Sequence, residues 1–152
     1  MRRYIRVFVV TAALFTAVFA TAACDEKLST IAGPTPNLEP TFASIQRDIF
    51  EAPDATGRPN CTRCHTTVGR TPSAGLSLDH DVSYDALVKA ASSRKTGATR
   101  VVPGDIGSSY LIDKLEGRAS IVGARMPLNG PYLSDGQVLI IRRWIELGAP
   151  RN

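Results

Sequence analysis

The stretch Asn60-Cys61-Thr62-Arg63-Cys64-His65 carries two cysteines separated by two residues and followed at once by a histidine. Two intervening residues let both sulfurs reach the two vinyl groups of one macrocycle, while the next residue offers a nitrogen ligand beneath its centre. The C-x-x-C-H pattern is therefore typical of covalent haem c attachment. We expect Cys61 and Cys64 to bind the cofactor and His65 to bind its iron.

Two other sites use the same pair of cysteines. A zinc site needs four ligands, and outside this motif the chain has only Cys24 and His80 to add. A thioredoxin-like dithiol belongs in a βαβ setting, whereas the residues that follow show short helical patterns and loops rich in Gly and Pro. A simple disulfide and an adventitious metal site stay open as alternatives.

The first residues predict export from the cytoplasm. A basic start with Arg2, Arg3 and Arg6 precedes an almost uncharged apolar run from Val7 to Ala20. This order of segments is that of a secretory signal peptide. Covalent haem attachment in bacteria also takes place outside the cytoplasm, so the two predictions agree.

The signal ends in Thr21-Ala22-Ala23-Cys24, which resembles the lipobox of bacterial lipoproteins. The resemblance implies that residues 1–23 are removed and that Cys24 is lipidated as the new N-terminus. Thr21 departs from the larger aliphatic residue usual there, so cleavage after Ala20 or Ala22, or an uncleaved anchor, stays open. With Cys24 lipidated, all three cysteines have a role.

Processing changes the charge of the chain. The full sequence has 18 Lys and Arg against 14 Asp and Glu, but three of the arginines lie in the signal, which leaves 15 against 14. A nearly balanced surface argues against nucleic-acid binding. Residues 24–40 are polar and rich in Pro, and we expect them to form a tether reaching on the order of 50 Å at most.

Residues 41–152 are expected to form a single all-α domain. About 110 residues suffice for one core and not for two. Phe42, Ile45, Ile49 and Phe50 share one face of a first helix that ends before Pro53 and Gly57, and a second helix runs from Ser83 as N-cap to about Ala91.

Two further helices complete the expected domain. The third begins after Ser108 or Ser109, carries Tyr110, Leu111 and Leu115, and ends at Gly117. The last begins with the capping box of Ser134 and Gln137, buries Val138, Ile141, Trp144 and Ile145, and ends at Gly148-Ala149-Pro150. Arg142 and Arg143 are expected to face solvent, and residues 99–102 to be extended.

An iron that shuttles electrons needs a second axial ligand, and Met126 is the leading candidate. It is the one Met that remains after the signal is removed, and it lies in a loop before the last helix and is followed by Pro127. Met also fills gaps in apolar cores, which is the competing interpretation. His80 lies between two aspartates, and we expect it to be exposed and not to bind iron.

Several segments together resemble the single-haem, class I type cytochrome c modules of exported bacterial proteins, over nearly the whole mature domain. They are residues 60–67, 74–79, 84–88, 102–105, 109–115, 125–127 and 144–150. The resemblance implies a small helical domain wrapped around one covalently attached haem, with the first and last helices packed across each other and His65 and Met126 on the iron. Members usually have a Pro whose neighbourhood accepts the proton of the proximal imidazole, and here Pro72 to Leu76 offers several carbonyls.

The expected function is therefore a one-electron carrier that contains haem c and its iron and is tethered by lipid to a bacterial membrane, facing the periplasm or the exterior. It would exchange electrons with a donor and an acceptor protein and turn over no substrate. Leu76, Leu78, Tyr110, Leu111 and Met126 would line the apolar pocket, and Arg125 and Tyr132 would contact the propionates. The alternative is a haem enzyme or gas-binding sensor with a labile sixth ligand.

Overall fold

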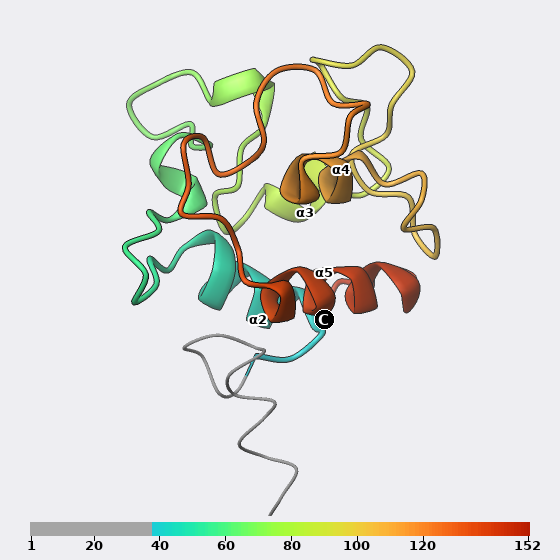
Figure 1. Cartoon of the computed structure of the whole chain (residues 1–152), viewed down its shortest axis with the longest axis horizontal. Coiled ribbons are helices and arrows are strands. Elements are labelled where there is room, and N and C mark those ends of the chain that lie inside the picture. The colour runs from blue at the N-terminus through green and yellow to red at the C-terminus, as the bar shows by residue number, and fades with distance from the viewer. Residues whose placement is uncertain (1–37) are drawn as a thin grey trace, which may run out of the picture.

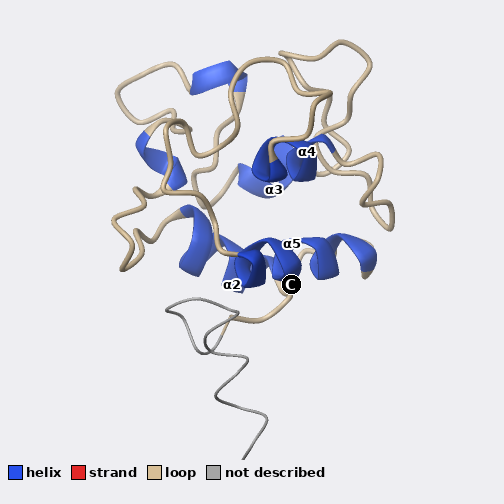
Figure 2. Cartoon of the chain, viewed as in Figure 1, coloured by secondary structure: helices blue, strands red, loops and turns tan. Residues whose placement is uncertain are grey.

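The computed structural model describes residues 38–152. The signal peptide, Cys24 and the tether as far as residue 37 lie outside these described residues. Within residues 38–152 the chain forms short helices joined by long loops, and isolated β-bridges take the place of a sheet (Figures 1 and 2). The ordered contacts begin before the expected start at residue 41, because Leu38 packs against the core and the Glu39 amide donates to Ser44 Oγ at 3.0 Å.

The first helix has the face that its sequence predicts. Helix α2, Phe42–Ile45, continues without a break into a π-helical turn, Gln46–Phe50. Thr41 caps its N-terminus, with Oγ1 accepting from the Ser44 amide at 3.2 Å. The four apolar side chains of the predicted face are all buried: Phe42, Ile45, Ile49 and Phe50.

The second helix differs from the prediction at both ends. Helix α3 is Ser83–Leu87, and Val82, not Ser83, is its N-cap residue. Ser83 lies inside the helix because its hydroxyl donates to the buried Gln46 Oε1 at 2.7 Å. The helix stops before Ala91 because the chain turns to pair with the extended segment, where the Lys89 amide donates to the Val101 carbonyl at 2.9 Å.

Helices α4 and α5 begin and end close to where the sequence places them. Helix α4, Tyr110–Glu116, follows Ser109 and ends at Gly117, which has a left-handed backbone. Helix α5, Asp135–Glu146, begins with the expected capping box. Its predicted apolar face is buried: Val138, Ile141, Trp144 and Ile145.

The polar face of α5 is partly used by ion pairs. The Arg142 Nη1 atom lies 2.7 Å from Glu116 Oε1 on α4, and the Arg143 Nη1 atom lies 3.3 Å from Glu146 Oε2. Arg143 is exposed, as expected, whereas Arg142 is half-buried because it also joins two helices.

The first and last helices pack against each other at the base of the domain (Figure 1). The Phe42 ring lies 5.4 Å from that of Trp144 and meets the Tyr84 ring edge-on at 5.1 Å. The C-terminus closes on the start of α2, because Asn152 accepts from the Phe42 and Ala43 amides at 3.0 and 2.7 Å. Helices α3 and α4 lie on the other side of α5 in the same view.

Candidate haem site

The C-x-x-C-H motif forms one tight turn that exposes its second cysteine. Residues Cys61–Arg63 are a 3-10 helix, and the amides of Cys64 and His65 both donate to the Cys61 carbonyl, at 3.2 and 3.0 Å. Cys61 is half-buried, Cys64 is exposed, and both are free thiols. The turn therefore exposes Cys64 and leaves Cys61 partly covered.

Cys61 lies against the core beside a buried cation. Its thiol donates to the Ile49 carbonyl at 3.6 Å, and Arg58 Nη1 lies 3.9 Å from its sulfur. Burial raises the pKa of the Cys61 thiol to about 11, and the charge of Arg58 and its contact with the sulfur act in the opposite direction. Nothing in the sequence pattern singles out Arg58.

His65 is held in an orientation that leaves one ring nitrogen free. Its Nδ1 lies 3.1 Å from the Ser73 carbonyl oxygen and 3.2 Å from that of Leu76. Because carbonyl oxygens only accept, Nδ1 carries the proton and donates, and Nε2 keeps its lone pair. Among the described residues Nε2 has no hydrogen-bond partner. This is the arrangement that protein metal sites use to orient a histidine ligand.

The loop that supplies these carbonyls has the backbone this requires. Ala74 and Gly75 both have left-handed conformations, with φ of 55° and 59°. They turn the chain so that residues on either side of them direct their carbonyls at one nitrogen. Within the segment from Pro72 to Leu76, the carbonyls of Ser73 and Leu76 accept the proton of His65 Nδ1.

Arg100 holds the same loop from outside, a role that only its charge indicates in the sequence. Its guanidinium donates to the Gly75 carbonyl at 3.2 Å and to the Ala86 carbonyl at 2.7 Å. The loop is also tied to the motif itself, because the Ser73 amide donates to the Cys64 carbonyl at 3.0 Å. The loop that orients His65 is therefore held by the motif and by Arg100, which also binds helix α3.

The imidazole of His65 favours its neutral form. Burial lowers the pKa of His65 below its ordinary value, the two carbonyl acceptors act in the opposite direction, and the charges of Arg100 and Lys114 add to the lowering. A neutral imidazole is the form that binds a metal. The donor set of this site, two thiols and an imidazole with a free Nε2, fits haem c.

Met126 lies half-buried at the edge of the same core. Its side chain packs against the core cluster, as do those of Cys61, Leu76 and Leu111. Its amide donates to the Lys114 carbonyl at 2.8 Å, and the charge of Lys114 is close enough to His65 to lower the pKa of that imidazole. The hydrogen bond to Lys114 ties the loop of Met126 to helix α4.

Other residues of the predicted site are arranged around this core. Leu78 and Tyr110 are buried, and Leu76 and Leu111 are half-buried. The Arg125 guanidinium stacks on the Tyr132 ring, 4.0 Å from its centroid, and donates from Nε to the Leu115 carbonyl at 2.7 Å. The structure therefore places the two predicted propionate partners together, and their role stays a prediction.

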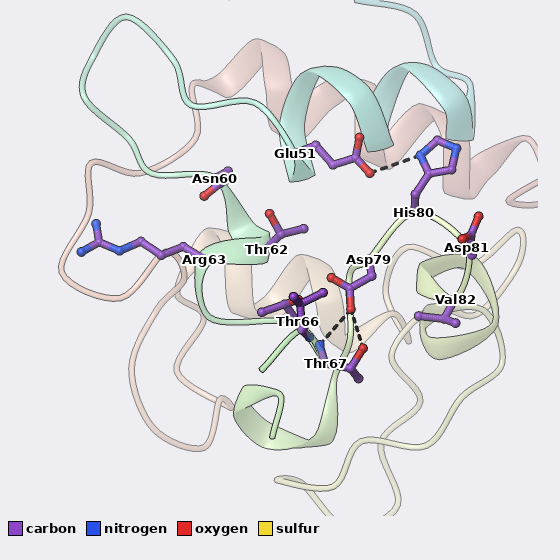
Figure 3. A pocket seen from close by; sticks show the side chains of 11 residues that line it. Glu51, Asn60, Thr62, Arg63, Thr66, Thr67, Asp79, His80, Asp81 and Val82 are labelled. Carbon is purple, nitrogen blue, oxygen red and sulfur yellow. Dashed lines mark hydrogen bonds and ion pairs between the residues drawn. The ribbon is translucent and has the colours of Figure 1, made fainter. Parts of the chain in front are cut away.

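His80 lies in a groove of about 550 Å³ that is also lined by Thr62 and Arg63 of the motif and by Thr66 next to His65 (Figure 3). Its Nδ1 lies 3.2 Å from Glu51 Oε1, and its side chain is 71% exposed. In the same groove Asp79 accepts from the Thr67 amide and hydroxyl, and hydrogen bonds from Thr66, Thr67 and Ser77 hold the pKa of its carboxyl well below its usual range. The expectation that His80 is exposed is confirmed.

Within residues 38–152 no three His, Cys, Asp or Glu side chains gather as a metal-binding cluster. No helix of this part of the chain is long and apolar enough to cross a membrane. Comparison of the sequence and structure with protein-family models, curated proteins and solved structures gives no match. The functional assignment therefore depends on the motif and on the geometry around it.

Proposed function

We propose that this protein is a one-electron carrier with a single covalently attached haem c, held by lipid on the extracytoplasmic side of a bacterial membrane. One observation carries the proposal. The imidazole of His65 is fixed through Nδ1 by two carbonyls, with Nε2 left free, in the residue directly after two free thiols spaced for thioether bonds.

Different residues of the chain would bind the macrocycle, bind the iron and surround the haem. The bound haem supplies a one-electron Fe(III)/Fe(II) couple. Cys61 and Cys64 would hold the macrocycle through thioether bonds, each formed by adding a thiol across a vinyl group, so that no atom is lost. His65 and Met126 are the proposed iron ligands, and the thioether of Met126 favours the ferrous state. Leu78 and Tyr110 are buried and would supply apolar surface around the macrocycle.

A carrier and an enzyme differ in the sixth ligand. If Met126 stays bound in both redox states, the iron offers no position to substrate and little rearranges on electron transfer. The chain then accepts one electron from a reduced donor protein and passes it to an oxidised acceptor. A peroxidase or a gas sensor would need Met126 to be absent from the iron or easily displaced.

The test is the mass and spectrum of the mature protein. We expect the full chain, produced in a bacterium with a cytochrome c maturation system, to carry the mass of one haem that acid and organic solvent do not extract. Cys61→Ser with Cys64→Ser should abolish this attachment, and His80→Ala should leave it intact. A mature parent chain with no haem mass would overturn the proposal, and an extractable haem would overturn its covalent part.

A further inference from the structure

Arg58 is a fully buried charge beside the proposed attachment site. Its exposed fraction is 0%, which is rare for arginine unless the guanidinium is fully paired. The residue lies three positions before Cys61, in the loop between the first helix and the motif. Nothing in the proposed attachment chemistry requires a cation at this position, so its burial calls for an explanation.

The guanidinium is satisfied by one carboxylate and three carbonyls. Nε donates to Asp54 Oδ2 at 2.9 Å, and the Asp54 side chain is only 5% exposed. Nη1 donates to the Ile49 carbonyl at 3.1 Å and to the Pro59 carbonyl at 3.3 Å, and Nη2 donates to the Ala52 carbonyl at 3.2 Å. These bonds offset the loss of hydration and fix the side chain in one orientation.

That orientation turns the positive end of the ion pair toward the sulfur. Nη1 is the atom that lies 3.9 Å from Cys61 Sγ, whereas the carboxylate of Asp54 binds at Nε. Asp54 is further held by the amide of Thr56 at 3.0 Å and by its hydroxyl. Burial by itself raises the pKa of Asp54, but hydrogen bonds from Thr56 and Arg58 outweigh it, so the carboxyl stays ionised.

We propose that the buried Arg58–Asp54 pair raises the reduction potential of the haem attached through Cys61, with Arg58 as the nearer and dominant charge. This inference rests on the proposed haem attachment. Reduction removes one positive charge from the iron, and a nearby fixed cation therefore favours the reduced form. Charges act strongly here because the pair is buried and poorly screened by solvent. Burial and local charge are established means of tuning haem potentials.

Single substitutions of the two partners should move the potential in opposite directions. Arg58→Gln leaves a buried carboxylate without its cation, and the potential should fall. Asp54→Asn leaves the cation without its counter-charge, and the potential should rise. A role of the pair in packing alone would move both variants the same way, because a loosened, wetter haem pocket lowers the potential whichever partner is lost. The measurement is a spectroelectrochemical titration of the purified holoprotein.

A double variant keeps the test decisive if a single variant fails to fold. Arg58→Gln with Asp54→Asn removes both charges and keeps polar side chains of similar size, and its potential should lie below that of the parent. Arg63→Gln is the matched control, because this exposed arginine lies within the motif and is screened by water. Its potential should stay near that of the parent.

The outcomes separate this inference from the proposed function. A parent chain without covalent haem would end the proposed function. Variants that carry haem and shift downward together, a double variant at or above the parent potential, or an equal shift in Arg63→Gln would overturn the role of Arg58 and leave the carrier intact.

Discussion

At the scale of single residues, Met126 distinguishes a carrier from an enzyme. Its amide is fixed to Lys114 and its side chain lies half-buried at the core edge, so its thioether is neither fully packed nor free in solvent. A methionine that only fills a gap in the core does not require the backbone hydrogen bond that fixes Met126 to Lys114. The two interpretations make different predictions about the iron.

If the Met126 sulfur is the sixth ligand, Met126→Ala opens a coordination position. Carbon monoxide should then bind the reduced protein, and the potential should fall as the ferrous-favouring thioether is lost. The substitution also removes core volume, at a cost of roughly 2 to 5 kcal/mol if the side chain were fully buried. Absorption spectra with and without carbon monoxide, and a potential titration, measure the ligand effect separately from the unfolding free energy.

Two further variants control for the cavity and for the other histidine. Met126→His restores a ligand and the lost volume, so carbon monoxide binding should disappear while the potential stays low. His80→Ala should change neither the spectrum nor the potential, because His80 pairs with Glu51 at an exposed position. A Met126→Ala protein with the parent spectrum and potential would make Met126 a packing residue.

The sequence indicates candidate residues where the pattern lies within a few neighbouring positions. It does not indicate residues whose partners are brought together only by the tertiary fold. The spacing of Cys61, Cys64 and His65 is a property of one turn, which the structure forms as a 3-10 helix over Cys61–Arg63. Arg58 and Gln46 gave no signal, because a polar residue becomes structural only when folding buries it against partners elsewhere. Gln46 donates to the Leu78 carbonyl at 2.8 Å, a partner 32 residues away along the chain.

At the scale of elements, the end of α4 positions the loop of Met126. Gly117 ends this helix with φ of 72°, and the side chain of Arg125 crosses directly above it. The loop that follows is held to α4 by Lys114 Nζ, which donates to the Val122 carbonyl at 3.1 Å and also to the Ala124 carbonyl. A side chain at residue 117 would therefore press on the loop that carries the proposed ligand.

Gly117→Ala should destabilise the fold for two reasons. A left-handed backbone costs alanine roughly 1 to 2 kcal/mol, and the added Cβ would lie 2.8 Å from Arg125 Cδ. Gly57→Ala is the matched control, because Gly57 also has a left-handed backbone, with φ of 82°, but open space around its Cβ position. Thermal unfolding of both variants should show the larger loss for Gly117→Ala, and equal losses would mean that Arg125 moves aside freely.

Elements were predictable where their end signals are carried by neighbouring residues. The capping box of Ser134 and Gln137 marks α5 because both partners lie within one turn, and Gly117 marks the end of α4 for the same reason. The sequence predicts too long a helix α3 because its apolar pattern continues past Leu87. The chain leaves the helix there to pair with residues 99–102, and that competition is invisible in a single segment.

At the scale of the whole molecule, the chain enters and leaves the domain at the same place. The described residues begin beside α2, and the C-terminus lies next to them, joined by the bonds of Asn152 to the first amides of α2 (Figure 1). The loops that carry the motif and Met126 lie on the far side of α5 in this view. The predicted tether would therefore join the domain at its helical base, beside the C-terminus.

This arrangement predicts that the anchor can be removed without loss of the haem site. Cys24→Ser eliminates the only residue that the lipobox-like sequence can lipidate, and it lies outside the domain that folds around Cys61 and His65. The variant should be recovered from the soluble extracytoplasmic fraction with its covalent haem, its spectrum and its potential unchanged, whereas the parent should need detergent for its release. Intact mass should show lipid on the parent N-terminus and none on the variant.

Cys61→Ser is the complementary control, since it should alter haem attachment and leave the membrane fraction unchanged. A parent chain whose intact mass retains the apolar run of residues 7–20 would show that the uncleaved signal is the anchor.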